Sequence, residues 1–384
     1  MAVPKLRFKD FSNNWDEIKT GEIFDNIVDN GYTDKTVLTI VQGIGTVPRA
    51  ESGRNMIYNE NAVSGYKRVK KNDFIIHLRS FEGGLEKANG DGVVSPAYTI
   101  LRPKNKIATS FLYDYFHTNK FINSVLAKAV EGIRDGRQIS YNMFKWLKIP
   151  FTSYEEQKKI SDFLTTFDKR ITAQKNIVAD LEETKKGLLQ KIFSQEIRFK
   201  DDNGQDYPKW ETHRLSDYAE YVSSTACCEA PCYLGTEDMI SNFGGVNIKK
   251  SQGNYSGYRF GKNNIILGNI RPYLKKCWIS DRQGICSTDL LVMNVKGIYP
   301  EILFMKMCTD EFVIYNMKGA KGTKMPRGDK KHIMNWTFRL PENGAEQQKI
   351  ADFLSTFDKK ITAEKQVLSD LQEMKKGLLQ QMFV

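Results

Sequence analysis

Basic residues in two glycine-containing segments, 131–141 and 318–331, are the strongest candidates for chemistry in this sequence. Arginine presents a planar fork that matches a guanine edge, whereas lysine, hydroxyl groups and backbone amides beside glycine hold phosphates. Arg79 and Arg271 each follow an apolar run and offer the same chemistry. We therefore predict contacts to nucleic acid, against the alternative that any single residue is a solvated surface charge. The predicted contact residues are Arg79, Arg134, Arg137, Ser140, Tyr141, Arg271, Lys321, Thr323, Lys324, Arg327 and Lys330.

Catalytic motifs do not accompany these residues. A loop that grips nucleotide phosphates follows GxxxxGK[ST], and the nearest segment, Gly257–Asn263, is too short and ends in asparagine. The acidic-x-Lys strings Glu183–Lys185 and Glu373–Lys375 resemble nuclease motifs, but both lie in a repeated helical segment. No glycine-rich cofactor loop or Asn- or Asp-Pro-Pro-aromatic string occurs, and the histidines lack the spacing of metal ligands and an adjacent nucleophile motif: His77, His117, His213 and His332. We expect no enzymatic activity and no bound cofactor.

Cysteine usage indicates free thiols. Six cysteines in a chain of this length do not predict a disulfide framework. The cluster of Cys227, Cys228 and Cys232 lacks the paired CxxC spacing and the later His or Cys pair of a structural zinc site. We therefore expect no metal.

The overall charge favours a polyanionic partner. The sequence holds 57 Lys and Arg against 46 Asp and Glu, a net charge of +11, and its pI is about 9.1. No segment supplies the roughly 20 apolar residues of a transmembrane helix, and the start MAVPKLRFKDF lacks the apolar core of a signal peptide. We expect a cytoplasmic protein that binds nucleic acid rather than a membrane.

One long segment occurs twice. Residues 156–193, beginning EQKKISDFLTTFD, recur at 346–383 as EQQKIADFLSTFD, with most positions identical and no gap. Both copies lack proline and are rich in helix-forming residues, so each predicts a long helix. Ser153 and Asn343 precede Glu156 and Glu346 by three residues, where a side chain caps the first helical turn.

Apolar residues in both copies follow the alternating steps of three and four that are typical of a coiled coil. The first seam is Ile160, Leu164, Phe167, Ile171, Val178, Leu181, Leu188 and Ile192. The second is Ile350, Leu354, Phe357, Ile361, Leu368, Leu371, Leu378 and Met382. Polar residues interrupt both seams at the same two steps: Gln174 and Lys185 in the first, Glu364 and Lys375 in the second.

The repeated seam favours two helices that pair with each other over two helices that each belong to a separate domain. The pattern alone leaves their relative direction open. A globular segment precedes each helix, and this topology favours an antiparallel pair.

The repeat extends weakly beyond the helices. Leu6–Asp10 with Trp15 is echoed by Ile197–Asp201 with Trp210, and Trp146 and Trp336 each stand ten residues ahead of a repeat copy. The interiors, 34–109 and 225–296, show no sustained identity. We predict two different modules with common boundaries, divided as 1–152 (first module), 153–197 (first spacer helix), 198–342 (second module) and 343–384 (second spacer helix).

Each module is predicted to mix strands and helices. Apolar runs favour strands at 37–41, 73–78 and 97–101 before a helical stretch at 110–129. In the second module, the corresponding stretches are strands at 263–270 and 289–295 and a helical stretch at 300–317. The predicted fold class is α+β, with two globular mixed α/β domains separated by two long helices that pair as an antiparallel coiled coil.

Taken together, the chain resembles the specificity subunit of type I restriction-modification systems over nearly its whole length. The most specific strings are EEQKKISDFLTTFD (155–168), AEQQKIADFLSTFD (345–358), KKGLLQKIF (185–193) and KKGLLQQMF (375–383). RDGRQISYNMFKWLKIP (134–150) is also similar to the family's usual approach to the first helix. KGTKMPRGDKKHIMNWTFRLP (321–341) departs from it by extra basic residues.

The resemblance implies a non-catalytic subunit with two target-recognition domains, each of which reads one half of a bipartite asymmetric site in double-stranded DNA. It implies two methylation subunits as partners, restriction subunits in the full complex, and adenine methylation in each half-site. S-adenosylmethionine, ATP and magnesium are then expected on the partner subunits. Candidate docking residues on the outward helix faces are Asp162, Asp168, Lys169, Asp352, Asp358 and Lys359.

Two other functions are compatible with parts of the sequence. A coiled-coil interaction protein without sequence-specific DNA readout would use the positive charge only for solubility. A self-sufficient modification enzyme would need the methyltransferase or nuclease motifs that the sequence lacks.

Overall fold

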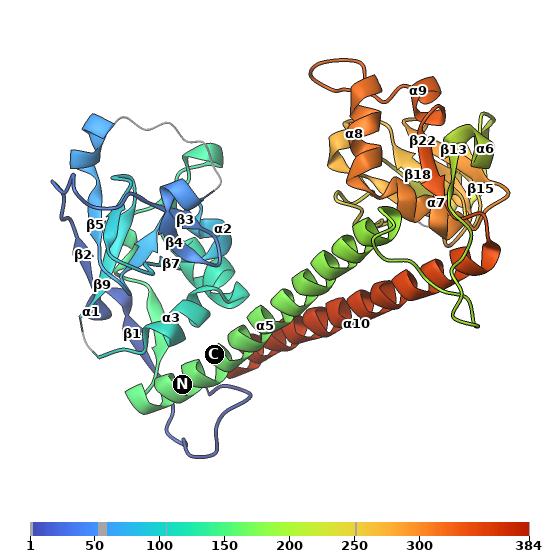
Figure 1. The fold of residues 1–384 in the computed structure, drawn as a ribbon. Coiled ribbons are helices and arrows are strands. Elements are labelled where there is room, and N and C mark those ends of the chain that lie inside the picture. Colours follow the sequence, from blue (N-terminus) through green and yellow to red (C-terminus); the bar gives the residue numbers. More distant parts are fainter. Residues whose placement is uncertain (1–2, 53–59, 105, 250–251, 384) are drawn as a thin grey trace. The chain divides into compact units, whose positions relative to one another are not determined.

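The computed structural model describes residues 3–52, 60–104, 106–249 and 252–383 (Figure 1). The chain forms two compact units: the first comprises residues 1–175 and 366–384, and the second comprises residues 176–365. Each unit therefore contains one globular domain and a part of both long helices. The sequence-based division differs because it treats each helix as a segment of its own.

The first unit is built from short strands and helices. Its strands are β1 (Asp16–Lys19), β2 (Phe24–Ile27), β3 (Leu38–Val41), β4 (Gly45–Pro48), β5 (Lys67–Val69), β6 (Phe74–Ile76), β7 (Glu86–Lys87), β8 (Gly92–Val94), β9 (Thr99–Pro103), β10 (Val130–Glu131), β11 (Gln138–Ile139) and β12 (Lys148–Phe151). Its helices ahead of the first long helix are α1 (Thr20–Ile23), α2 (Ser80–Gly83), α3 (Thr109–Phe116) and α4 (Tyr141–Phe144). Tighter or wider helical turns lie at Arg49–Glu51, Glu60–Gly65, Phe121–Val125, Leu126–Ala129 and Arg134–Gly136.

The second unit has a similar composition of elements. Its strands are β13 (Glu211–Arg214), β14 (Ala219–Tyr221), β15 (Thr225–Ala230), β16 (Tyr233–Leu234), β17 (Gly253–Phe260), β18 (Ile265–Gly268), β19 (Cys277–Ile279), β20 (Gly284–Cys286), β21 (Leu290–Val295) and β22 (Thr337–Leu340). Its helices between the two long helices are α6 (Leu215–Tyr218), α7 (Pro300–Met307), α8 (Asp310–Gly319) and α9 (Lys330–Met334), with a 3₁₀ turn at Pro272–Leu274. The long helices are α5 (Tyr154–Phe193) and α10 (Gly344–Met382).

Both globular domains contain the same antiparallel sheet although their interiors share no sustained sequence identity. The strand order is β2-β9-β6-β7 in the first unit and β14-β21-β18-β19 in the second. Phe74 pairs with Leu101 and Lys87, and Ile265 pairs with Met293 and Ile279 at the same places of the second sheet. Phe74 and Ile265 are fully buried. The two modules therefore share one framework, this four-stranded sheet, and differ in the residues that it carries.

The layers around this sheet differ between the domains. The first unit adds the two-stranded sheets β3-β4 and β5-β8, whereas the second adds the four-stranded sheet β15-β17-β20-β16. β15 and β17 were not predicted. The segment that forms β15, Thr225–Ala230, contains few of the β-branched or aromatic residues that favour strands. Pairing with β17 along its whole length holds this segment extended.

The predicted strands are confirmed, but each predicted helical stretch is broken. Residues 110–129 divide at Thr118, whose hydroxyl accepts a hydrogen bond from the Phe121 amide at 3.1 Å. Residues 300–317 divide at Thr309, whose hydroxyl accepts from the Phe312 amide at 3.4 Å. A threonine that caps the following turn competes with continuation of the helix.

Each long helix is joined to its own globular domain through a buried glutamate. Glu156 accepts hydrogen bonds from Arg7 at 2.6 and 2.9 Å and from the Trp15 indole at 3.1 Å. Glu346 accepts from Arg198 at 3.0 and 3.2 Å and from the Trp210 indole at 3.0 Å. The weak sequence similarity around Trp15 and Trp210 therefore reflects this joint, which both units share.

The predicted caps of the long helices are confirmed. The Glu156 amide donates to the Ser153 hydroxyl at 3.3 Å, and the Glu346 amide donates to the Asn343 side chain at the same distance. α5 ends at Phe193, before the predicted limit at residue 197, because Gln195 takes a left-handed backbone conformation with φ 64°.

Within each unit the long helices run antiparallel. In the first unit, Asp168 of α5 lies 2.6 Å from Lys375 of α10. In the second unit, Lys185 of α5 lies 2.5 Å from Asp358 of α10. The early part of each helix thus lies beside the late part of the other, and the antiparallel arrangement favoured by the topology is present.

All of the predicted seam residues are buried or half-buried, but some pack into a globular domain and others do not. Ile160 and Leu164 join the core of the first globular domain, and Ile350 and Leu354 join the core of the second. Ile171, Val178, Ile361 and Leu371 are buried outside those domain cores. The ends of the helices are therefore domain core helices as well as partners of each other.

The two tryptophans ahead of the repeats do not occupy equivalent places. Trp146 is 62% exposed, whereas Trp336 is 2% exposed. The amide of Thr20 donates to the carbonyl of Leu147, and the amide of Leu215 donates to that of Trp336. Leu147, not Trp146, is therefore the counterpart of Trp336, and the equal spacing in the sequence is misleading here because the second unit has one extra residue before its long helix.

Candidate nucleic-acid interface

Arg79 lies at the start of α2, in the connection from the central strand β6 to the edge strand β7. Its side chain is 80% exposed and its guanidinium lies 3.9 Å from Glu82. Arg137 belongs to the β10–β11 hairpin, residues 130–139, which we name the first basic hairpin; it lies 3.8 Å from Glu82 and 4.2 Å from the Phe81 ring centroid. The structure thus brings Arg79 and Arg137 together around one carboxylate. Arg134, on the same hairpin, is also exposed.

A buried glutamate holds the base of this connection. Glu86 is fully buried and accepts hydrogen bonds from the Gly43 amide at 2.7 Å, from Gln42 at 2.8 Å and from the Tyr113 hydroxyl at 3.1 Å. Burial opposes its ionisation, but the His117 ring at 3.1 Å and these donors hold the pKa of Glu86 below its usual value. Gln42 also donates to the Gly83 carbonyl, which fixes α2 and with it Arg79.

Two predicted contact residues of the first unit have structural partners. The Ser140 hydroxyl caps α4 by accepting from the Met143 amide at 3.3 Å. The Tyr141 hydroxyl donates to the carbonyl of Phe24 at 3.0 Å. Both residues therefore hold the end of the first basic hairpin in place, and any contact to DNA would have to be made in addition.

Arg271 occupies the corresponding place of the second unit, immediately before the turn Pro272–Leu274 that follows central strand β18. Its backbone is left-handed, with φ 54°, and its amide donates to the carbonyl of Pro326 at 2.7 Å. Pro326 belongs to a second hairpin, residues 321–327, which Lys321 and Arg327 close by two backbone hydrogen bonds of 2.9 Å. We name it the second basic hairpin.

The second basic hairpin carries most of the remaining predicted residues. Arg327 lies 3.0 Å from Asp289, and Lys321 lies 2.7 Å from Asp329. The Lys321 ammonium lowers the pKa of Asp329 to about 2, so the carboxylate that caps α9 stays ionised. Thr323 and Lys324 are exposed at the tip of the hairpin.

Lys330 follows the second basic hairpin and lies against two aromatic rings. Its ammonium is 5.8 Å from the ring centroids of both Tyr221 and Tyr258. Burial raises the pKa of Tyr221, so its hydroxyl remains a neutral donor, and it donates to the Lys330 carbonyl at 3.2 Å. Such contacts orient a lysine without removing its charge.

Acidic and aromatic residues that position the basic ones were missed in the sequence. Glu82, Phe81 and Asp289 contact predicted arginines, yet none stands near its partner in the chain except Glu82 beside Arg79. Only the fold brings Asp289, immediately before β21, to the hairpin that carries Arg327. No pattern in the sequence indicates these contacts.

Three buried polar atoms beside the second basic hairpin have no hydrogen-bond partner within the part of the chain that the structure describes. They are Nε of Arg271, Oδ1 of Asn269 and Oδ1 of Asn316. A Cβ at Gly328 would lie 2.6 Å from the Asn316 oxygen and 3.0 Å from the Asn269 oxygen. A side chain at position 328 would therefore displace these two amide groups from their present places.

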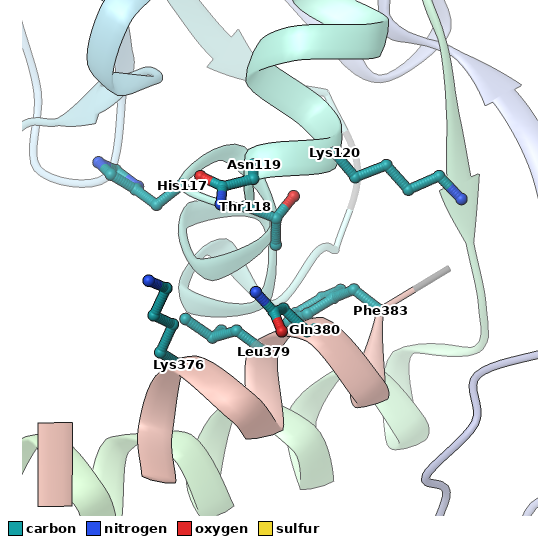
Figure 2. A pocket seen from close by; sticks show the side chains of 8 residues that line it. All are labelled: His117, Thr118, Asn119, Lys120, Lys376, Leu379, Gln380 and Phe383. Carbon is teal, nitrogen blue, oxygen red and sulfur yellow. The ribbon is translucent and has the colours of Figure 1, made fainter. Parts of the chain in front are cut away.

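Figure 2 shows a cavity of about 320 Å³ in the first unit, where the end of α3 meets the last turns of α10. Leu379 and Phe383 form its apolar part, and Lys120 and Lys376 also line it. In the second unit, Lys186 at the place of Lys376 pairs with Asp310 at 3.1 Å. The cavity belongs to the joint between helix and domain, and its residues offer hydrogen bonds and positive charge rather than a nucleophile.

Neither a metal site nor a membrane-spanning helix occurs among the residues that the structure describes. In residues 3–52, 60–104, 106–249 and 252–383, no three His, Cys, Asp or Glu side chains converge as ligands of a metal ion. No helix in the described part of the chain combines the length and apolarity needed to cross a membrane.

The segment that was compared with a phosphate-binding loop, Gly257–Asn263, forms the end of strand β17 and a turn in which the Gly261 amide donates to Asn264.

The fold and the loops together define a duplicated protein whose two domains present basic hairpins from the same place of one framework. The family described as the type I restriction modification DNA specificity domain matches this chain twice, over residues 12–183 and 195–373. The chain therefore belongs to the type I restriction-modification specificity subunit family and has two target-recognition domains.

Named relatives and solved structures agree with this assignment. The type I restriction enzyme MjaVIII specificity subunit of Methanocaldococcus jannaschii is 23% identical over 335 residues, which cover 81% of this chain and 78% of the relative. The MjaIX specificity subunit of the same organism is 22% identical over 325 residues, covering 78% and 74%.

Two solved structures share the fold. The S subunit of a type I restriction-modification system from M. genitalium has a TM-score of 0.54 at 16% identity and covers 100% of this chain and 99% of its own. A chain from a study of complex assembly and conformational transition of the type I R-M system has a TM-score of 0.56 at 12% identity, covering 97% and 98%.

Proposed function

We propose that each target-recognition domain reads one half of a bipartite asymmetric site in double-stranded DNA, and that the chain itself carries out no chemistry. The observation that carries this proposal is the repeated construction of the basic surface. In both units an arginine follows the central strand of the sheet, and a basic hairpin packs beside it. The framework is common, whereas the residues at the tips differ, as two different half-sites require.

Several features of the basic hairpins suit base and phosphate contacts. Arg79 and Arg134 are exposed, and Arg137 lies 4.2 Å from the Phe81 ring centroid, a contact that limits its rotamers before DNA arrives. A side chain that is already oriented loses less entropy on binding. The exposed Lys324 and Lys321 suit phosphate oxygens, which supply affinity without sequence information.

We propose further that the helical pair sets the spacing between the half-sites and docks two methylation subunits. The repeat supports this because Lys169 and Lys359 are exposed at equivalent places of the two helices. Asp168 and Asp358, also predicted to dock partners, are engaged by the seam lysines and serve the helical pair first. Asp162 and Asp352 hydrogen-bond within their own helices.

The remaining components of the complex are assigned by the same proposal. Restriction subunits complete the ATP-dependent nuclease, and S-adenosylmethionine, ATP and magnesium bind to the partner subunits rather than to this chain. Adenine leaves the base stack to reach a methyltransferase site, so the recognition domains act on DNA that is opened at the target base.

Footprinting on a DNA library tests this proposal. The purified chain, together with its methylation subunit, is expected to protect one sequence made of two short conserved blocks separated by an unconserved spacer. Raising the salt concentration should weaken binding steeply, because many phosphate contacts release counterions. Binding that is salt-sensitive but shows no sequence preference would instead favour a coiled-coil interaction protein that does not read DNA.

A further inference from the structure

Each basic hairpin carries one exposed apolar side chain at its tip. Ile133 on the first basic hairpin is 81% exposed, the highest value among the large apolar residues that the structure describes. Met325 on the second basic hairpin is 49% exposed. Exposing a large apolar side chain to water is unfavourable, and neither residue belongs to a hydrophobic core of the described part of the chain.

The turn of the first basic hairpin is built to hold Ile133 outward. Gly132 has φ +83°, and a Cβ at this position would lie 2.4 Å from the carbonyl oxygen of Gly136. The Gly136 amide donates to the Ile133 carbonyl at 3.1 Å, and Arg137 donates to the Arg134 carbonyl at 3.1 Å. The loop is therefore closed on itself, and the Ile133 side chain remains outside it.

Charged residues of both signs lie around Ile133. Arg134 and Arg137 follow it on the same hairpin, together with Glu131 and Asp135, and Arg137 shares Glu82 with Arg79. An apolar residue among charged groups does not suit an apolar protein surface, because docking there would desolvate those groups without partners. It does suit a duplex, whose phosphates take the arginines while its stacked bases accept an apolar group.

The second unit repeats this arrangement with different residues. Met325 stands between Lys324 and Pro326, and the Pro326 carbonyl accepts the amide of Arg271 at 2.7 Å. Arg327, which closes the hairpin, lies 3.0 Å from Asp289. Both hairpins lead into a short helix capped by a side chain, Ser140 for α4 and Asp329 for α9. Both loops therefore carry an exposed apolar side chain at the tip, although their sequences differ.

We propose that Ile133 and Met325 insert into the base stack of their half-sites and hold the duplex open beside the target adenine. This inference rests on the proposed function. Isoleucine and methionine are among the side chains that proteins use as wedges between base steps, and the wedge recovers part of the free-energy cost of unstacking by filling the gap. The flanking arginines and lysines anchor each tip against the phosphates on either side.

The test uses the full chain in complex with its methylation subunit and a duplex with 2-aminopurine, which fluoresces when unstacked, at one target adenine. Ile133→Ala is expected to reduce the fluorescence gain and the methylation rate at the first half-site by at least about fivefold, with the second half-site unchanged. Met325→Ala is expected to do the reverse. Ile133→Phe should restore most of the signal because a larger apolar group also fills the gap.

Controls separate a wedge from other roles. Val28→Ala and Ile314→Ala remove apolar side chains that are 69% and 58% exposed but lie outside the hairpins, and should leave both signals unchanged. Equal fluorescence for wild type and Ile133→Ala would overturn the inference. So would a defect that disappears when uracil replaces thymine, because the residue would then read a thymine methyl group. If the wild-type complex shows no sequence preference, the proposed function fails before the variants are compared.

Discussion

The ammonium group of Lys375 on α10 lies 2.6 Å from the carboxylate of Asp168 on α5, and the same contact recurs between Lys185 of α5 and Asp358 of α10 at 2.5 Å. The two lysines occupy equivalent positions of the repeat, and so do the two aspartates. Such reciprocal pairing arises when two copies of one helix lie antiparallel. The polar residues that interrupt the seam therefore specify direction and register, which is the established use of polar seam positions.

The two reciprocal ion pairs are expected to have similar strengths. The lysines Lys375 and Lys185 are 19% and 22% exposed, and their partners Asp168 and Asp358 are 51% and 53% exposed. Double-mutant cycles in urea unfolding should therefore give about 0.5 to 1 kcal/mol for each pair. Asp114 lies 3.7 Å from Lys375 but cancels in the cycle, so a difference of more than about 1 kcal/mol between the pairs would contradict their equivalence.

The buried joint at Glu156 is expected to be worth more than these exposed pairs. Glu156→Gln leaves the Arg7 guanidinium without its carboxylate and should lower the free energy of unfolding of the first unit by about 3 kcal/mol. Glu155→Gln, one residue earlier and exposed, is the matched control and should change it by less than about 0.5 kcal/mol. Thermal unfolding monitored by tryptophan emission measures both, since Trp15 donates to Glu156.

The same joint predicts an acid dependence. Burial opposes ionisation of Glu156, but hydrogen bonds from Arg7, Thr152 and Trp15 outweigh it and hold the pKa below the usual 4.5. An acid whose pKa is lowered by folding stabilises the fold above its unfolded pKa and loses that contribution as the pH falls through the folded value. Glu156→Gln should therefore flatten the loss of stability below about pH 4.5, and an unchanged acid limb would contradict the assigned joint.

Asp114 predicts a pH dependence of opposite sign. Burial raises its pKa to about 6, partly opposed by Lys375, while Asp168, His117 and Lys87 also act on it. Because folding raises this pKa, ionisation of Asp114 costs stability as the pH rises from about 4 through 6. Asp114→Asn should gain up to about 3 kcal/mol over wild type at pH 7.5, and much less at pH 4. Asp162→Asn, exposed on α5, is the control and should show no such trend.

Loss of a predicted base contact should affect one half-site alone. Arg79→Ala is expected to weaken binding by about 5- to 150-fold and to relax the sequence preference in the first half-site, and Arg271→Ala should do so in the second. Lys324→Ala should weaken binding to every sequence and reduce the salt slope by about 1. Lys209→Ala, which removes an exposed lysine that belongs to neither hairpin, is the control for loss of charge. Competitive binding to half-site mutants at several salt concentrations measures all four.

The features of the fold that depend on local patterns could be predicted from the sequence. The features that depend on tertiary contacts could not. The heptad spacing and the caps Ser153 and Asn343 placed both long helices, because each of these signals acts within a few residues. Asp168 and Lys375 could also have indicated the relative direction of the helices. That inference needs the seam lysines to be treated as partners of aspartates on the other helix, not only as interruptions of the seam.

The candidate interface was predicted as residue types and completed only by the fold. Arg79 and Arg137 meet because β6 and the first basic hairpin both end beside α2, which no spacing in the sequence shows. Conversely, Ser140 and Tyr141 looked like contact residues because a hydroxyl suits a phosphate, yet a helix cap and a backbone carbonyl already use them. The comparison of Trp146 with Trp336 was wrong, because one additional residue in the second unit shifts the spacing between the tryptophan and the long helix.

Genome-wide mapping of N6-methyladenine tests the central claim most directly. Cells that carry this chain and its methylation subunit should show one bipartite motif with an adenine methylated in each half. Replacing residues 1–152 by the first domain of another family member should change one half of that motif and leave the other half and the spacer unchanged. A motif that survives deletion of this chain, or an exchange that alters both halves together, would contradict the account.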